Sequence, residues 1–243
     1  MSDLRSTKVI TPQDRLIMAL DVASFDEATH WVDKLGDAVS FYKLGLELFM
    51  SGDYYRLMDW LLAREKKIFV DLKFFDVPET VKKAVKQLNG RGATFATVHG
   101  NDAILRAAAE AKGEIKILGV TVLTSLDRGD LDDLGFACDV EQLVLSRARR
   151  ALANGCDGVI SSGLEVPKLR AEVDDKLIAI TPGIRPVENR PQDDQKRTVD
   201  VAQAFRNGAD YIVVGRPIRQ ATDPYQMAQQ IQRTIRDVFT PTV

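Results

Sequence analysis

The strongest constraint on the fold is a regular alternation of short apolar runs with segments of helical spacing. The apolar runs are rich in β-branched residues and mostly lack strict polar alternation, which is typical of strands with both faces covered. We predict a strand at each of eight such runs. They lie at residues 16–22, 39–45, 67–73, 93–99, 115–124, 157–162, 177–183 and 210–215.

The segments between these strands have the apolar spacing of amphipathic helices. They lie at 26–35, 53–65, 79–88, 102–112, 139–154, 164–173, 198–207 and 223–238. Gly155 and Gly208 are typical helix stops before a new strand. Eight strand–helix units in a chain of 243 residues predict the α/β class and a single (β/α)8 TIM barrel domain over residues 1–243.

The connections between elements bear on both fold and function. A doubly wound open sheet is the alternative fold, but it is less favoured because no GxGxxG motif follows the first strand. No linker or low-complexity segment divides the chain. Two connections that follow predicted strands, 125–138 and 184–197, are unusually long and polar. Long polar connections of this kind are often binding loops.

Composition and charge exclude several classes of partner. The net charge is −2 and there is no basic block, so the sequence indicates neither nucleic acid nor an anionic membrane as partner. The two cysteines have no metal-binding spacing. Residues 1–15 lack the apolar core of a signal peptide, and no apolar run reaches the roughly 18 residues of a membrane span. We therefore expect a cytoplasmic protein.

Charged residues stand where three successive predicted strands end. Asp21 ends the first strand, Lys43 lies near the end of the second, and Asp71 and Lys73 end the third. Residues two apart in a strand share a face, so Asp71 and Lys73 are expected to enter one mouth of the barrel, with Asp76 in the loop beyond. Active sites of such barrels lie at this mouth. Because burying unpaired charge is costly, a catalytic charge array is favoured over the alternative, a salt-bridge network that closes the barrel.

The loops after the last two strands suggest an anion site. Strand eight ends in VVGRPI, so Gly215 and Arg216 begin the final connection, where barrels often bind phosphate. Arg185, Gln195 and Arg197 follow strand seven and could close over the same anion. The alternative is an ordinary Gly-Arg turn with a solvated arginine.

With these residues in place, the sequence resembles the bacterial orotidine 5′-phosphate decarboxylase family over nearly its whole length. The motifs are ALDV (19–22), YKLG (42–45), DLKFFDVPET (71–80), VTVLTS (120–125), TPGIR (181–185), DQKR (194–197) and VVGRPI (213–218). The D-x-K-x-x-D run alone also occurs in related sugar-phosphate barrels, but its combination with the other motifs is highly specific. Val77 and Glu79 stand where the family commonly has Ile and Asn, and neither change removes a charged catalytic group.

The resemblance implies a homodimer of (β/α)8 barrels that uses no metal and no organic cofactor. Its implied reaction converts orotidine 5′-phosphate to uridine 5′-phosphate (UMP) and carbon dioxide, the last step of de novo UMP synthesis. Lys73 is the implied proton donor to C6 of the pyrimidine, and Asp71 is the carboxylate that faces the substrate carboxylate. Lys43 and Asp76 complete the charge array, and Asp76 and Thr80 enter the site of the partner subunit.

The resemblance also implies a contact for each part of the nucleotide. The expected residues are Asp21 and Lys43 for the ribose hydroxyls, Thr124 and Ser125 for the base, Pro182 for an apolar wall, and Gln195, Gly215, Arg216 and the nearby Arg185 for the phosphate. A phosphate grip far from the reacting carbon suits this reaction, because binding energy from a non-reacting group can lower the barrier.

Two other functions stay open on the sequence alone. One is a magnesium-dependent sugar-phosphate decarboxylase or synthase of the same superfamily. Those proteins resemble this chain at the D-x-K-x-x-D run, but they have a metal-binding Glu at the position of Lys43. The other is a non-catalytic barrel that binds a phosphate ligand. Such a barrel would keep Gly215 and Arg216 but would not need Asp71 and Lys73 together.

Overall fold

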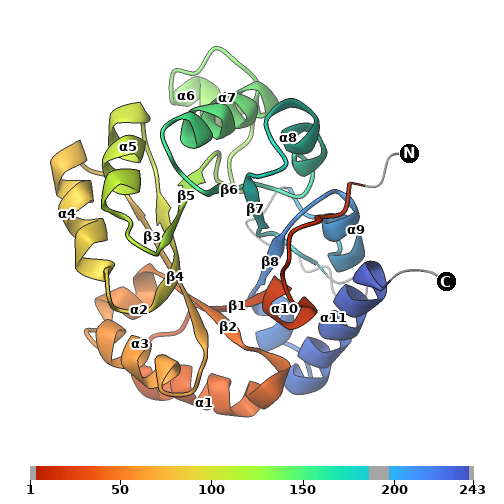
Figure 1. The fold of residues 1–243 in the computed structure, drawn as a ribbon. Coiled ribbons are helices and arrows are strands. Elements are labelled where there is room, and N and C mark those ends of the chain that lie inside the picture. Colours follow the sequence, from red (N-terminus) through yellow and green to blue (C-terminus); the bar gives the residue numbers. More distant parts are fainter. Residues whose placement is uncertain (1–3, 186–196, 241–243) are drawn as a thin grey trace.

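Eight parallel strands close into a barrel in the computed structural model, which describes residues 4–185 and 197–240 (Figure 1). Each strand is hydrogen-bonded to the next along the chain, and β1 pairs with β8 to close the ring. The predicted (β/α)8 barrel is therefore confirmed. The strands are β1 Leu16–Leu20, β2 Phe41–Leu44, β3 Lys67–Phe74, β4 Ala93–Val98, β5 Lys116–Val120, β6 Gly158–Ile160, β7 Ile178–Thr181 and β8 Tyr211–Val214.

Helices follow the strands and form the outer ring seen in Figure 1. Within the described residues they are α1 Phe25–Leu35, α2 Leu46–Met50, α3 Tyr54–Leu62, α4 Pro78–Leu88, α5 Asp102–Ala111, α6 Arg128–Asp133, α7 Val140–Ala153, α8 Val166–Glu172, α9 Val201–Arg206, α10 Arg216–Arg219 and α11 Pro224–Phe239, with 3-10 helices η1 Pro12–Arg15 and η2 Gly36–Ala38. Each predicted helix overlaps one of these. The short helices α2, α6 and α10 were not predicted.

Local sequence explains where the helices begin and end. The side chains of Ser24, Asn101 and Asp139 accept hydrogen bonds from backbone N–H groups in the first turns of α1, α5 and α7, which satisfies donors that a helix start leaves open. Gly155 and Gly208 have φ angles of 85° and 100°. Glycine adopts this conformation without the steric cost of a Cβ atom, so both residues let the chain turn back into the next strand.

The connection at 125–138, which was predicted as a long polar loop, includes a short helix that was not predicted. It contains α6, which begins with a reciprocal capping box between Asp127 and Asp130. Each aspartate side chain accepts a hydrogen bond from the backbone N–H of the other. This local pairing starts a helix in a stretch whose polar composition is typical of a loop.

Two apolar layers hold the barrel together. The outer layer packs the strands against the helices, and the inner layer fills the barrel with residues such as Phe41, Phe69 and Phe95. The ring centroids of Phe41 and Phe95 are 5.4 Å apart, and those of Phe69 and Phe95 are 5.9 Å apart. Burial of each such ring contributes about 1.5–3 kcal/mol. These rings fill the centre of the barrel.

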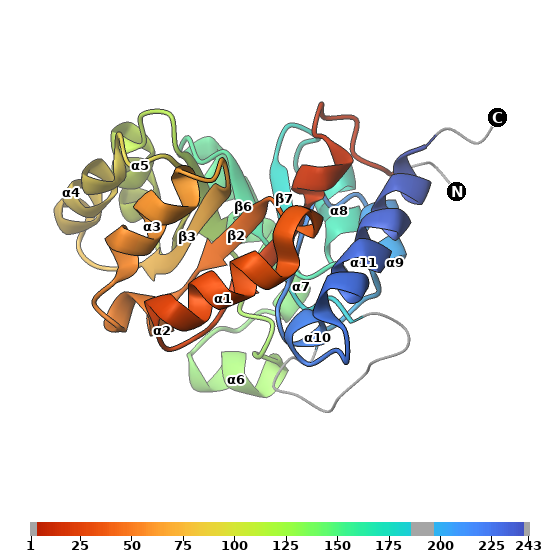
Figure 2. The same cartoon turned by 90° about the horizontal axis from the view of Figure 1, so that it is seen from below.

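The two ends of the barrel differ. Figure 2 shows α2, α6 and α10 gathered at one end, where the strands terminate, and this end is called the mouth. The N-terminal segment and η1 lie at the opposite end, called the floor. None of the helices in the described part of the chain is long and apolar enough to cross a membrane.

Candidate active site

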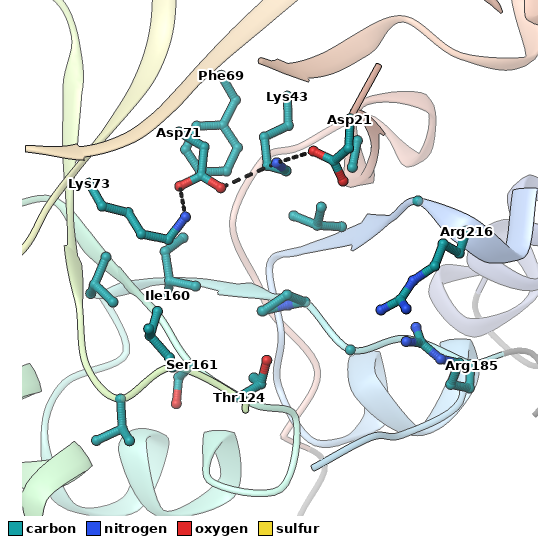
Figure 3. Close-up of a pocket in the computed structure, with 18 residues that line it drawn as sticks. Asp21, Lys43, Phe69, Asp71, Lys73, Thr124, Ile160, Ser161, Arg185 and Arg216 are labelled. Carbon is teal, nitrogen blue, oxygen red and sulfur yellow. Dashed lines mark hydrogen bonds and ion pairs between the residues drawn. The ribbon is translucent and has the colours of Figure 1, made fainter. Parts of the chain in front are cut away.

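A cavity of about 220 Å³ opens at the mouth of the barrel. It is bounded by residues from the ends of strands on both sides of the ring (Figure 3). Most of the predicted site residues line it, namely Asp21, Lys43, Asp71, Lys73, Thr124, Pro182, Arg185, Gly215 and Arg216. The fold therefore brings together residues that are separated by almost two hundred positions in the sequence.

Four charged side chains form a continuous row along one wall of this cavity (Figure 3). The Lys43 ammonium lies 3.1 Å from Oδ1 of Asp21 and 3.3 Å from Oδ2 of Asp71. The Lys73 ammonium lies 2.9 Å from Oδ1 of Asp71. Negative and positive charges thus alternate from the end of β1 to the end of β3, and Lys73 stands at one end of the row.

The row keeps its central groups ionised. Burial raises the pKa of Asp71, but the ammonium groups of Lys43 and Lys73 outweigh this effect and hold the pKa below its usual range. Burial likewise lowers the pKa of Lys43, but Asp71 and Asp21 outweigh it, so the pKa of Lys43 is raised. A buried pair keeps its charges when the partners compensate the lost hydration. At neutral pH the cavity wall therefore carries fixed charges.

The backbone at Lys73 departs from regular strand geometry. Val70 pairs with Ala96 and Phe74 with Val98, so β3 bulges relative to β4. Lys73 has a φ angle of 49°, in the left-handed region that costs a residue other than glycine about 1–3 kcal/mol. Asp71 and Lys73 do meet at the mouth, as predicted, but this bulge and not simple strand alternation sets how Lys73 approaches Asp71.

Thr97 on β4 supports this conformation and was missed by the sequence analysis. Its hydroxyl accepts a hydrogen bond from the backbone N–H of Lys73 and donates one to Oδ1 of Asp71, both at 2.9 Å. Thr97 is fully buried. A polar residue within the apolar run 93–98 was the available signal, because a buried hydroxyl needs hydrogen-bond partners.

Two guanidinium groups mark the opposite side of the cavity. Figure 3 shows Arg185, beyond β7, and Arg216, at the start of α10, directed toward each other and away from Lys73. Arg185 is buried, and its backbone N–H donates to the Val199 carbonyl at 2.9 Å. A Cβ atom at Gly215 would come within 3.3 Å of the Ala19 side chain, so glycine suits this close approach between β8 and β1.

Several predicted residues do not line the cavity. Asp76 and Thr80 are exposed on the β3–α4 loop and the first turn of α4, and Oδ1 of Asp76 accepts from the backbone N–H of Val77 at 2.6 Å. Ser125 is half-buried beside Thr124 but is not part of the cavity wall. Gln195 lies outside the described residues.

Arg197 does not take the predicted position over an anion. Its guanidinium pairs with Oε1 of Glu165 at 2.5 Å and donates to the carbonyls of Val122 and Leu123. Neither Glu165 nor this use of Arg197 was predicted. Their contacts join three different βα loops, which no pattern within a single segment reveals.

The part of the chain that the structure describes contains no group of three His, Cys, Asp or Glu side chains arranged to hold a metal ion. The two carboxylates nearest each other in the cavity wall, Asp21 and Asp71, are separated by the Lys43 ammonium. That ammonium occupies the space between them in which a cation would have to bind.

Comparisons with known proteins agree with this geometry. Residues 14–231 match the family model described as orotidine 5′-phosphate decarboxylase / HUMPS family. A Methylococcus capsulatus protein named orotidine 5′-phosphate decarboxylase is 70% identical over 98% of this chain and 99% of its own length. A protein of the same name from Xanthomonas euvesicatoria pv. vesicatoria is 50% identical over 96% of each chain.

A solved structure is similar over the whole barrel. The crystal structure of orotidine 5′-phosphate decarboxylase from Lactobacillus acidophilus has a TM-score of 0.81 and 34% sequence identity, and the match covers 91% of this chain and 99% of that one. The family predicted from the motifs is therefore confirmed. On the strength of a matched model that spans most of the barrel and relatives that align over nearly their full length, this chain belongs to the orotidine 5′-phosphate decarboxylase / HUMPS family.

Proposed function

We propose that this enzyme converts orotidine 5′-phosphate to UMP and carbon dioxide using its own side chains, without a metal or an organic cofactor. The observation that carries the proposal is the row Asp21–Lys43–Asp71–Lys73, with successive N–O separations of 3.1, 3.3 and 2.9 Å. The reaction is the one named for its relatives. Its place as the last step of de novo UMP synthesis and a cytoplasmic location stay predictions.

The chemistry requires fixed positive charge near the reacting carbon. When the bond between C6 and the carboxylate breaks, the electron pair stays on C6 in a σ orbital that the pyrimidine ring delocalises poorly. Preorganised charge at the point where negative charge develops is usually the largest catalytic contribution. The Lys73 ammonium supplies that charge and then donates a proton to C6, which yields UMP. The resulting amine regains its proton from solvent.

Asp71 has two roles in this proposal. It orients the ammonium groups of Lys73 and Lys43 through contacts of 2.9 and 3.3 Å, and Thr97 fixes the carboxylate by a hydrogen bond. Asp71 also faces the carboxylate of the substrate. The repulsion between these like charges is relieved as carbon dioxide departs, which favours bond cleavage.

The far side of the cavity binds the phosphate group. Arg185 and Arg216 approach each other there, and guanidinium groups bind phosphate through charge-assisted hydrogen bonds. Gly215 lets the backbone come close to the bound phosphate. This contact lies away from the reacting carbon, so its binding energy orients the pyrimidine without holding the departing carboxylate.

The decisive experiment is turnover of orotidine 5′-phosphate in the presence of a metal chelator. The purified protein is expected to release UMP and carbon dioxide at a rate that the chelator does not change. Loss of activity on chelation, restored by magnesium, would favour a metal-dependent sugar-phosphate enzyme instead. Tight binding of UMP without turnover would favour a non-catalytic binding barrel.

We further propose that the active form is a homodimer in which Asp76 and Thr80 reach the partner subunit's cavity. Phe75 and Val77, on either side of Asp76, expose 68% and 63% of their surface. Apolar side chains at this density on a loop are typical of a surface that another protein covers. Asp76 itself is exposed and is not among the residues that line the mouth cavity of its own chain.

Mixing two inactive variants tests this arrangement. Lys73→Ala and Asp76→Asn subunits damage different halves of a shared site, so a mixed dimer retains one intact site. If subunits exchange freely, equal mixing should restore about one quarter of wild-type activity, as expected for a twofold dimer. The matched control mixes Lys73→Ala with Asp71→Asn, which lie in the same chain's site and should give no recovery. Recovery in neither mixture would remove Asp76 from the partner's site.

A further inference from the structure

A buried ion pair behind the cavity is not explained by the proposed chemistry. Glu165, between β6 and α8, is 6% exposed, and its Oε1 lies 2.5 Å from the guanidinium of Arg197. Arg197 precedes α9, on the connection that follows β7. Burying two charges is costly and is repaid only when geometry and additional hydrogen bonds are good. The other contacts of Glu165 and Arg197 therefore indicate which parts of the structure this ion pair holds in place.

The arginine reaches across to the loop that follows β5. Its Nη2 donates to the carbonyls of Val122 and Leu123 at 3.2 and 2.9 Å. These residues have left the β5 ladder, which ends at Val120. Backbone carbonyls that lose their strand partners need other donors when they are buried. Arg197 supplies the donors, and its planar fork can contact a carboxylate and two carbonyls at once.

The turn held in this way carries residues expected near the pyrimidine. The carbonyl of Leu123 also accepts from the backbone N–H of Leu126 at 2.9 Å, so residues 123–126 form a tight turn with Thr124 inside it. Leu123 and Thr124 both line the cavity. Arg197 is therefore hydrogen-bonded to the turn that forms this part of the cavity wall.

The glutamate anchors the pair to a second part of the wall. Oε2 of Glu165 accepts a hydrogen bond from the Ser161 hydroxyl at 3.3 Å, and Ser161 lines the cavity beside Ile160. On the other side, Arg197 is only two residues from Val199, which forms an isolated β-bridge with Ile184 next to Arg185. The pair thus connects the expected base side of the cavity with the chain segment that carries Arg185.

We propose that Glu165 and Arg197 are positioning residues that hold the wall at Leu123 and Thr124 in the correct place for the pyrimidine. This inference rests on the proposed function, because it assigns the two sides of the cavity to base and phosphate. Neither residue touches the nucleotide. Their loss disturbs recognition of the base and leaves the ribose phosphate contacts in place.

The test compares two ligands that share the phosphate end. UMP contacts both sides of the cavity, whereas ribose 5-phosphate lacks the base. For Arg197→Gln we expect UMP affinity to fall at least about tenfold while ribose 5-phosphate affinity changes less than about twofold. Equal losses for both ligands, or no loss for either, would overturn the proposal. Titration calorimetry measures both affinities without requiring turnover.

A double-mutant cycle with Thr124→Ala gives a second readout. If Arg197 acts by placing Thr124, removal of Thr124 should cost UMP affinity clearly less in the Arg197→Gln background than in the wild type. Strict additivity of the two losses would contradict this role. Arg149→Gln is the matched control, since Arg149 forms an exposed pair with Glu172 at 2.9 Å and should leave both affinities unchanged.

Two safeguards keep the outcome clear. If Arg197→Gln does not fold, Arg197→Lys retains a charge opposite Glu165 but loses the fork that reaches both carbonyls. The same pattern of UMP and ribose 5-phosphate affinities is then expected. Turnover of orotidine 5′-phosphate by the wild type is measured separately, so failure of the proposed function and failure of the positioning role are distinguished.

Discussion

Asp71 at the mouth of the barrel and Asp210 at its floor are both buried carboxylates that contact two cationic side chains. Asp71 lies between Lys43 and Lys73 in the wall of a cavity. Asp210 precedes β8 and lies 3.2 Å from the Lys8 ammonium and 2.8 Å from the Arg170 guanidinium. The same combination of charges thus occurs at both ends of one barrel.

The contacts at the floor are structural. Asp210 also accepts a hydrogen bond from the backbone N–H of Ala179 at 2.9 Å and another from the Ser6 hydroxyl. Its partners come from the N-terminal segment, α8 and β7, so one carboxylate ties three segments together. Its side chain is fully buried and is surrounded by donors from the protein itself.

The balance of charge also differs between the two ends. At the mouth, Lys43 contacts two carboxylates, and their attraction outweighs burial and raises its pKa. At the floor, burial is the largest influence on the pKa of Lys8, and together with the nearby Arg170 it outweighs the attraction of Asp210, so this pKa is lowered. A buried carboxylate between two cations is therefore not by itself an active site. What distinguishes the mouth is that a row of four alternating charges lines its cavity, and that the pKa of Lys43 is raised there whereas the pKa of Lys8 at the floor is lowered.

If the charges at the mouth perform the reaction, removing a cation there should abolish decarboxylation. Lys73→Ala should lower kcat at least about 10⁴-fold, because both the charge near C6 and the proton donor are lost. Binding of UMP should persist, since the phosphate contacts remain. Steady-state turnover and calorimetry measure the two effects.

The matched control for Lys73→Ala is Lys8→Ala, which removes the corresponding ammonium from the floor. It should leave the kcat of the folded protein unchanged, because Lys8 does not border the cavity. A kcat close to that of the wild type in Lys73→Ala would remove Lys73 from its role, and a large loss in Lys8→Ala would invalidate the distinction between the two ends.

The floor should show its largest effect on stability. Asp210→Ala leaves Lys8 and Arg170 without their carboxylate, and removal of one member of a buried ionic group typically costs about 3–5 kcal/mol. Urea unfolding measures this loss. Glu110→Ala serves as the control, because Glu110 forms an exposed ion pair with Lys82 and its removal should change the free energy of unfolding much less than Asp210→Ala.

The activity of the folded Asp210→Ala protein completes that experiment. Below the unfolding transition, its kcat should equal that of the wild type. A protein of normal stability with reduced kcat would show that the floor participates in catalysis, contrary to the comparison.

A substitution on the phosphate side of the cavity separates phosphate binding from the other contacts of the nucleotide. Arg216→Ala removes a charged donor, and hydrogen bonds to charged groups contribute about 1.5–3 kcal/mol, so UMP affinity should fall roughly thirtyfold. Affinity for uridine, which lacks the phosphate, should not change. Arg233→Ala on the exposed face of α11 is the control. Equal losses for UMP and uridine would contradict the assignment of Arg216 to the phosphate.

The sequence predicted the barrel well because strands with both faces covered leave a clear apolar signal. Each predicted run overlaps one observed strand, and seven of the eight runs extend past the C-terminal end of the strand, whereas β3 continues one residue past its run to Phe74. The fifth run covers 115–124, whereas β5 ends at Val120. Val122 and Leu123, beyond the end of β5, are apolar because they form part of the cavity wall. An apolar pattern in the sequence does not distinguish a residue buried in a strand from one buried in the wall of a cavity.

The site was predictable only where barrel geometry alone brings residues together. Parallel strands end at one mouth, so charges at the ends of β1, β2 and β3 had to meet there. The bulge at Lys73 and the hydrogen bonds of Thr97 depend on the register between β3 and β4, which sequence spacing does not specify. The pair of Glu165 and Arg197 depends on loop conformations for the same reason. The partner-subunit role of Asp76 cannot be derived from one chain.

The smallest predicted effect concerns how each end of the barrel responds to high pH. The ordinary pKa of lysine here is 10.5, and the pKa of Lys8 is lowered from it while that of Lys43 is raised. At pH values between the folded pKa of Lys8 and 10.5, the folded protein has released the Lys8 proton, whereas the unfolded chain still holds it. The Lys8 contribution to the free energy of unfolding therefore increases with pH in that window.

Lys43 should have the opposite sign above pH 10.5, because the folded protein keeps a proton that the unfolded chain has lost. Its stabilising contribution then decreases as pH rises, and a single proton changes the free energy by at most about 1.4 kcal/mol per pH unit. Urea unfolding of wild type, Lys8→Met and Lys43→Met from about pH 8 to about pH 12 isolates each contribution as a difference from the wild type. Differences of the same sign for both variants would mean that the folded protein shifts the pKa values of Lys8 and Lys43 in the same direction. Opposite signs are expected, since the Lys43 ammonium contacts two carboxylates and the Lys8 ammonium contacts one.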